Sequence, residues 1–188
     1  VKIANDMDAE IISADSRQVY KGMDIGTGKE LEEYILKNKK KIPYHLIDII
    51  NPQDKYNVLQ FQKDTQKILL KLKKRGKIPI LCGGTGLYIK AILMNFQLPA
   101  VQPNIELRKK LIHHDLNELI KKLNSLCNNN SQKYLTDTKR RVIRAIEIEM
   151  NIKKNKRSKH HSFQKKFNNP LVIGIGLPRK NIKEKITK

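Results

Sequence analysis

The chain has 188 residues and a mass of 21.8 kDa, and its 39 lysines and arginines against 18 aspartates and glutamates give a formal charge of +21. Hydrophobic residues make up 39%, enough for a folded core, and no apolar run approaches the roughly 18 residues that a membrane-spanning helix needs. The start of the chain lacks a secretion signal and its two cysteines are too few to cross-link a fold, so we expect a cytoplasmic protein.

In the first half, apolar patterns predict an alternation of strands and helices. The expected strands, all of them buried, are 10–14, 45–50 and 78–82. The expected helices are 1–7, 56–75 and 87–96. Strand, glycine turn and helix follow one another from 78 to 96, which is typical of a parallel sheet covered by helices.

Composition changes after Pro99. Only helical patterns occur from 103 to about 168, broken by the polar stretch 128–131, and the apolar run 171–177 predicts one further core strand before a helix that starts near Asn181. We therefore expect an α/β core with an all-helical insert, as in many domains of this size. The core would comprise 1–98 and 169–188, and the insert 99–168.

Positive charge is concentrated towards the end of the chain. From 151 to 188 there are 12 lysines and arginines and one acidic residue. The run 153–161 contains Lys153, Lys154, Lys156, Arg157 and Lys159 beside two histidines. Such a block would neutralise several phosphates of an RNA. Lysines outnumber arginines by 31 to 8, however, so a solvated surface shaped by an AT-rich genome stays an alternative.

Asp15 is the first candidate for chemistry. It follows the first expected strand and is flanked by Ser16, Arg17 and Gln18. Open α/β sheets bind ligands at this edge, where a carboxylate could accept a proton or orient a metal. Aspartate in such a position also commonly caps a helix or forms a turn. The residues alone leave both functions open.

The glycine turn GGTG, at 83–86, is the second candidate and follows the expected strand 78–82. Its glycines would let the backbone approach a phosphate or a base closely, and the following helix would favour negative charge. A plain tight turn is the alternative.

Arg140, Arg141 and Arg144 form the third candidate group. Arg140 and Arg144 share a helix face, with Arg141 beside them. Guanidinium groups on one face suit the recognition of phosphate or pyrophosphate through forked hydrogen bonds. The alternative is a solvated basic face.

Two other site types are not expected. The segment from Gly22 to Lys29 is similar to a phosphate-binding P-loop only superficially, because that motif has four residues between its glycines whereas Gly22 and Gly28 have five. Glu30 also stands where the motif has serine or threonine. No histidine has zinc-ligand spacing relative to the cysteines, so we expect no zinc site.

Four segments, taken in order and spacing, resemble the tRNA dimethylallyltransferase (tRNA isopentenyltransferase) family, which prenylates the adenosine just 3′ of the anticodon. They are EIISADSRQVYKGMDIGTGK (10–29), IPYHLIDI (42–49), GKIPILCGGTGLYIKAIL (76–93) and RRVIRAIEI (140–148). The resemblance implies a P-loop NTPase-like parallel-sheet core with an all-helical insert. It also implies transfer of a dimethylallyl group from dimethylallyl diphosphate to adenine N6, Mg²⁺ as cofactor, the tRNA anticodon stem-loop as partner, and a monomer.

The resemblance assigns functions to particular residues. Asp15 would be the general base on N6, and Thr85 would be the second catalytic residue. Arg179 would help to hold the diphosphate. The matched tRNA-contacting positions are Asp15, Ser16, Arg17, Gln18, Thr85, Arg108, Arg140, Arg141, Val142, Ile143 and Arg144.

The sequence also departs from the family pattern. The family's P-loop, with its main magnesium-binding region, should end a few residues before Val1, and a further C-terminal part should follow Lys188. We therefore expect the chain to be an internal part of a longer enzyme. Tyr44 stands where the family often has a second histidine, and LTDT at 135–138 replaces the commoner HPND.

Three other functions stay open at this point. An adenine-nucleotide prenyltransferase would act on free AMP or ADP, although the basic insert favours a large RNA. A nucleoside or nucleotide kinase would share the core but gives no reason for the motif at 10–29. A non-catalytic RNA-binding remnant would bind RNA by charge alone, with a steep dependence on salt.

Overall fold

The computed structural model describes residues 1–95, 99, 101–128, 130–155 and 170–186. The chain divides into two compact units. The first unit contains Val1–Tyr56, Asp64–Asn95 and Gln164–Lys188, and the second contains Asn57–Lys63 and Phe96–Phe163. The domain boundaries expected from the sequence stay predictions.

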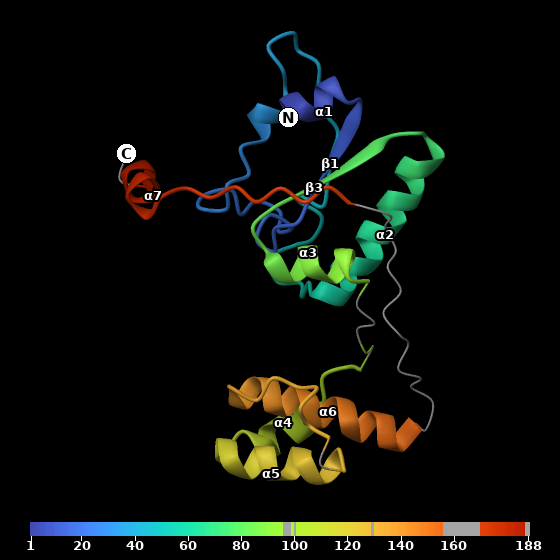
Figure 1. The fold of residues 1–188 in the computed structure, drawn as a ribbon, viewed down its shortest axis with the longest axis vertical. Coiled ribbons are helices and arrows are strands. Elements are labelled where there is room, and N and C mark those ends of the chain that lie inside the picture. Colours follow the sequence, from blue (N-terminus) through green and yellow to red (C-terminus); the bar gives the residue numbers. More distant parts are fainter. Residues whose placement is uncertain (96–98, 100, 129, 156–169, 187–188) are drawn as a thin grey trace. The chain divides into compact units, whose positions relative to one another are not determined.

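A parallel sheet of three strands, in the order β2-β1-β3, lies at the centre of the first unit (Figure 1). The strands are β1 (Ala9–Ser13), β2 (Tyr44–His45) and β3 (Ile78–Cys82). All five residues of β1 are buried, because it pairs with a neighbour on each side. The expected parallel α/β arrangement is confirmed.

Helices precede and follow these strands, and apart from one short 3-10 helix they occur in the order that the sequence predicts. They are α1 (Lys2–Asp6), the 3-10 helix η1 (Leu31–Tyr34), α2 (Val58–Lys74), α3 (Gly86–Leu93) and, near the end of the chain, α7 (Arg179–Ile186). The helices expected at 1–7, 56–75 and 87–96 are confirmed, with ends that differ by one to three residues. Because crossover connections return the chain to the start of the next parallel strand, the carboxyl ends of the strands lie at one edge of the sheet.

Three strand expectations are wrong in part or in full. Strand β2 ends at His45, because Leu46 and Asp48 have φ angles of 64° and 54°, which no β-strand accommodates. Strand β3 is an edge strand and half-exposed rather than buried. The run 171–177 forms no strand and is exposed, since apolar side chains alone do not make a strand without a backbone ladder.

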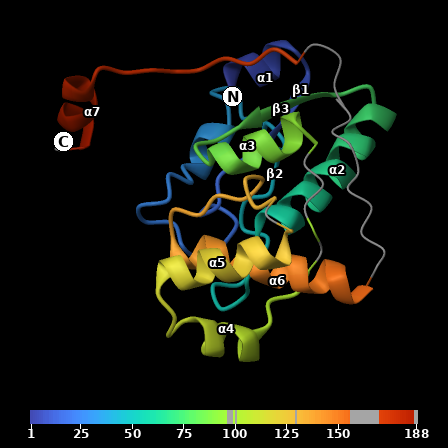
Figure 2. The same ribbon diagram turned by 60° about the horizontal axis from the view of Figure 1, so that its bottom comes forward.

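The second unit is helical in its described part, as expected for the insert. It contains α4 (Ile105–Leu111), α5 (Leu116–Leu126) and α6 (Lys139–Asn155). Figure 2 shows α5 lying along α6, and apolar residues of these two helices and of α4 form one core. The core residues are Leu111, Leu119, Leu123, Val142, Ile143, Ala145 and Ile146. Asp115 and Glu118 form a capping box that starts α5.

Candidate active site

The carboxyl ends of β1 and β3 meet because the two strands are parallel and adjacent. Beyond β1, the Ala14 N–H donates to the Cys82 carbonyl oxygen at 2.7 Å, and the Thr85 N–H donates to the Ala14 carbonyl oxygen at 3.1 Å. Residues 15–18 and the glycine turn 83–86 therefore lie against each other. The two candidate motifs of the core are brought together at the edge where α/β sheets bind ligands.

Gly83 allows this close approach. A Cβ atom on Gly83 would lie 2.4 Å from the carbonyl carbon and 2.5 Å from the carbonyl oxygen of Ala14. Backbone atoms cannot swing away as a long side chain can, so only glycine fits here without displacing the end of β1. Packing between the two loops thus requires this glycine.

We expect Gly83→Ala to lower the free energy of unfolding by about 2–3 kcal/mol, because the added methyl group overpacks the end of β1. Gly84→Ala is the matched control, since the nearest atom to a Cβ there is Asp15 Oδ2 at 4.0 Å. For the control we expect a change within about 1 kcal/mol. Urea unfolding followed by circular dichroism measures both variants, and equal stabilities would contradict the packing argument.

The Thr85 hydroxyl joins the two loops. Its oxygen accepts a hydrogen bond from the Ser16 N–H at 3.0 Å and lies 3.2 Å from Ser16 Oγ, to which it donates. Both side chains are partly buried. Thr85 and Ser16, which the family resemblance places among the tRNA-contacting residues, are therefore in direct contact beside Asp15.

Asp15 has one carboxylate oxygen engaged and one that is open. Oδ1 accepts a hydrogen bond from the Arg17 N–H at 2.8 Å, which forms the turn that was considered as the alternative function. Oδ2 makes no hydrogen bond within the part of the chain that the structure describes. A single carboxylate can therefore hold the turn with one oxygen and accept a proton with the other.

Tyr88 is a neighbour that sequence analysis did not single out. It lies in α3 and is 5% exposed. Burial raises the pKa of its phenol to about 12, and the charges of Tyr20 and Asp15 contribute to the increase. The phenol therefore stays protonated at neutral pH. Its position two residues after the glycine turn, in GGTGLY, was the available signal.

The Gln18 amide is hydrogen-bonded inside the protein through both its nitrogen and its oxygen. Its Nε2 donates to the carbonyl oxygens of Thr27 at 3.2 Å and Gly28 at 2.9 Å, and its Oε1 accepts from Ser13 Oγ at 2.7 Å. Both donors and one acceptor position are occupied. Gln18 therefore joins the end of β1 to the loop that ends at Lys29, and a base contact from this amide stays a prediction.

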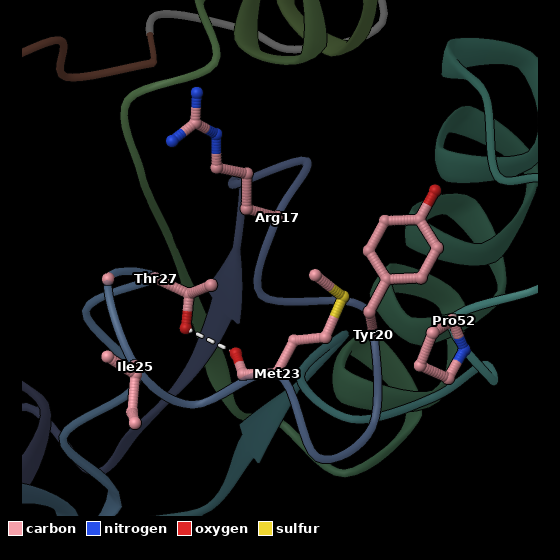
Figure 3. Close-up of a pocket in the computed structure, with 7 residues that line it drawn as sticks. Arg17, Tyr20, Met23, Ile25, Thr27 and Pro52 are labelled. Atoms are coloured by element: carbon pink, nitrogen blue, oxygen red, sulfur yellow. Dashed lines mark hydrogen bonds between the residues drawn. The ribbon is translucent and has the colours of Figure 1, made fainter.

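A hollow of about 430 Å³ opens between this loop and the residues after β1 (Figure 3). Arg17, Tyr20, Met23, Ile25, Gly26, Thr27 and Pro52 line it. Tyr20, Met23 and Pro52 lie close together in Figure 3, and the Thr27 hydroxyl donates to the Met23 carbonyl oxygen at 2.7 Å. The guanidinium of Arg17 makes no hydrogen bond or ion pair with any described residue. The hollow thus combines an apolar and aromatic lining with one available cation.

In the helical unit, Glu147 holds two of the candidate arginines. Its side chain is 1% exposed and accepts hydrogen bonds from Arg108 Nε at 2.6 Å, Arg108 Nη2 at 2.7 Å, Arg144 Nη1 at 3.1 Å and the Asn104 N–H at 2.9 Å. Burial by itself would raise the pKa of Glu147, but these bonds outweigh burial and lower it. Arg144 also donates to the Val101 carbonyl oxygen at 2.8 Å. Glu147 was missed in the sequence, although its spacing of three residues from Arg144 was a signal.

The other residues of the arginine segment differ in their surroundings. Arg140 is exposed, and no described residue pairs with its side chain. Arg141 is exposed and forms an ion pair with Asp137. Val142 and Ile143 lie in the apolar core, at 0% and 5% exposure. Their side chains belong to that core, so the expected RNA contact of these two residues would have to involve their backbone and stays a prediction.

The remaining expectations have less structural support. Arg179 is exposed at the start of α7. Of the basic run, Lys153 and Lys154 lie in α6, and 156–161 falls outside the described residues. No group of three His, Cys, Asp or Glu side chains in the described ranges is placed to hold a metal ion. No helix within those ranges has the length and apolar character needed to cross a bilayer.

The chain is similar in sequence to one protein family and to curated proteins of that kind. The family model described as "IPP transferase" matches residues 18–188. The chain is 46% identical over 186 residues to tRNA dimethylallyltransferase 1 of Azobacteroides pseudotrichonymphae genomovar. CFP2, which covers 99% of this chain and 60% of that protein. It is 44% identical over 188 residues to tRNA dimethylallyltransferase 2 of Bacteroides fragilis, covering 99% of this chain and 59% of that protein. The chain thus spans about 60% of the length of these curated relatives.

A solved structure supports the fold. The structure titled as crystallographic snapshots of a eukaryotic dimethylallyltransferase acting on tRNA matches with a TM-score of 0.63 and 24% identity, covering 82% of this chain and 40% of that chain. At this identity the match bears on the fold alone. The P-loop-like α/β core expected from the resemblance is thereby confirmed.

Proposed function

The chain belongs to the IPP transferase family, and from this premise we propose that the complete protein is a tRNA dimethylallyltransferase. It transfers the dimethylallyl group of dimethylallyl diphosphate to N6 of the adenosine 3′-adjacent to the anticodon. The observation that carries the proposal is the open Oδ2 of Asp15, placed where the ends of β1 and β3 meet and beside the linked pair Ser16 and Thr85. The names of the 46% and 44% identical relatives support the same reaction.

Asp15 would act as the general base. The exocyclic nitrogen of adenine is a poor nucleophile until its proton has an acceptor. In the proposed step N6 forms a bond to C1 of the dimethylallyl group, the C1–O bond to diphosphate breaks, and the N6 proton passes to Oδ2. The adenosine must leave its stack to reach a carboxylate at the sheet edge. Thr85 would keep the Asp15 loop in place through Ser16.

Mg²⁺ is part of the proposal for the complete protein, but the described residues do not form a site for it. No cluster of three acidic, histidine or cysteine side chains is present among them. The location in the cytoplasm, the monomeric state and the help of Arg179 in holding diphosphate are likewise proposed for the complete protein.

The substrate can be tested directly. The complete protein is incubated with dimethylallyl diphosphate and an anticodon stem-loop, with AMP as competitor, and prenylated adenosine is measured by mass spectrometry. Modification of the adenosine next to the anticodon, unaffected by excess AMP, supports the proposal. Preferential modification of AMP would identify an adenine-nucleotide prenyltransferase, and RNA binding without any prenyl transfer would identify a non-catalytic binder.

We expect Arg140→Ala to weaken RNA binding about three- to tenfold and to reduce the salt slope by about one, because its guanidinium is exposed and unpaired among the described residues. Lys121→Ala removes one exposed charge from α5 and serves as the control. Fluorescence anisotropy with a labelled stem-loop at several salt concentrations measures both variants. Equal losses for the two would show that only overall charge matters.

A further inference from the structure

Lys29 is a buried lysine at the end of the loop 20–29, which includes the segment from Gly22 to Lys29 that only superficially matches a P-loop. Its side chain is 2% exposed, and its Nζ donates to the Tyr20 carbonyl oxygen at 2.5 Å, to Asp48 Oδ1 at 2.5 Å and to Asp24 Oδ1 at 3.1 Å. An ammonium has three N–H groups, and all of them are used. Lys29 therefore has no donor left for a phosphate, in agreement with the spacing that argued against a P-loop.

The three acceptors come from different places in the chain. Tyr20 begins the loop, Asp24 lies at its middle, and Asp48 lies 19 residues beyond Lys29 in the segment after β2. The contacts therefore close the loop on itself and fasten it to the core. Burial opposes the charged form, but the bonds to Asp48 and Asp24 outweigh it and raise the pKa of Lys29, so it stays charged.

The same loop is fastened on its other side by Gln18. The carbonyl oxygens of Thr27 and Gly28 accept from the Gln18 amide, and Gly28 has a φ of 65°, which glycine adopts without strain. Gln18 lies only three residues from Asp15. The position of the loop is thus coupled to the residues that follow β1.

The loop also forms most of the hollow in Figure 3. Met23 and Ile25, at 47% and 100% exposure, present apolar surface to solvent beside Tyr20 and Arg17, whose guanidinium has no partner among the described residues. Single-stranded RNA is recognised by such a combination, in which bases stack on aromatic and apolar groups and guanidinium groups contact phosphates or bases. An RNA substrate fits this lining better than a diphosphate, which needs several cations.

We propose that Lys29 is a positioning residue for the RNA substrate: it holds the loop 20–29 in the conformation that forms the hollow beside Arg17. This inference rests on the proposed tRNA-modifying function. Without the ammonium, the carboxylates of Asp24 and Asp48 repel each other and the loop loses its central contact. RNA would then have to select the ordered conformation from a mixture.

The test is steady-state kinetics of Lys29→Met in the complete protein. If the loop of the variant is ordered for about one tenth of the time, KM for the anticodon stem-loop rises about tenfold, while kcat and KM for dimethylallyl diphosphate stay within about twofold. A purely structural function of Lys29 would instead reduce the folded fraction and lower kcat at an unchanged KM. The KM–kcat split thus separates the two functions.

Two further variants keep the test decisive. Lys21→Met removes an exposed lysine from the same loop and controls for the loss of charge, with an expected KM change within about twofold for RNA. Asp48→Asn keeps an acceptor but removes one partner charge, so it should raise KM for RNA by a smaller factor than Lys29→Met. This variant carries the test if Lys29→Met fails to fold. An unchanged KM in both Lys29→Met and Asp48→Asn would overturn the proposal, as would a rise confined to KM for dimethylallyl diphosphate.

Hydrogen exchange of the loop, measured without substrates, separates this inference from the proposed function. Faster exchange of residues 20–29 in Lys29→Met than in Lys21→Met is expected whatever reaction the protein catalyses. If the loop exchanges faster but the wild-type protein prenylates no RNA, the proposed function fails and the loop contact stands. If the loop exchanges at the wild-type rate, the positioning inference fails even in an active prenyltransferase.

Discussion

Replacing Asp15 with asparagine in the complete protein is expected to lower kcat for prenyl transfer about 1000-fold, while the Kd for the anticodon stem-loop stays within about threefold. The amide keeps an oxygen that can accept the Arg17 N–H, so the turn seen at 2.8 Å is preserved. It has no basic oxygen for the N6 proton. Single-turnover kinetics with labelled dimethylallyl diphosphate, together with an RNA-binding measurement, tests this expectation.

Asp15→Ala is the companion variant because it removes the proton acceptor and the turn together. If Asp15 is the base, the asparagine and alanine variants lose similar amounts of kcat, and only the alanine variant also loses stability or RNA affinity. If Asp15 only forms the turn, asparagine retains most of the activity and alanine does not. The comparison separates the two functions that the sequence left open for this residue.

The local parts of the site were predictable from the sequence. A buried apolar run followed by Asp15, and another followed by the glycine turn 83–86, indicate two parallel strands whose ends meet. Each signal lies within about ten residues, so no knowledge of distant contacts is needed. The helix α5 was predictable for the same reason, since Asp115 and Glu118 form its cap from within one turn.

The parts that were missed depend on residues far apart in the sequence. Lys29 is paired with Asp48, and Glu147 is hydrogen-bonded to Arg108 across 39 residues. Spacing on one helix placed Arg140 and Arg144 on a common face, but it did not reveal the buried Glu147 carboxylate, which binds Arg144 and not Arg140. The run 171–177 failed for a related reason: whether an apolar segment becomes a strand depends on a neighbouring backbone, which its own sequence does not encode.

Glu147→Gln is expected to destabilise the helical unit by about 2–3 kcal/mol. Breaking a buried ion pair by removing one partner commonly costs about 3–5 kcal/mol, and we expect a smaller loss here because water can reach the arginines left behind. The Arg108 and Arg144 side chains are 44% and 34% exposed, whereas that of Glu147 is 1% exposed. The glutamine amide also directs N–H groups at a guanidinium. Urea unfolding of the 188-residue chain at neutral pH measures the effect.

The pH dependence of this difference identifies its cause. The pKa of Glu147 is lowered in the folded state, so its ionised form stabilises the fold above the ordinary pKa of glutamate, and this contribution is lost as the pH falls through the lowered value. The stability difference between the wild-type chain and Glu147→Gln should therefore shrink below about pH 4. Glu106→Gln, an exposed change at the start of α4, controls for net charge, with an expected effect below about 1 kcal/mol. A difference that stays constant with pH would mean that amide packing, and not the lost charge of the ion pair, accounts for the destabilisation.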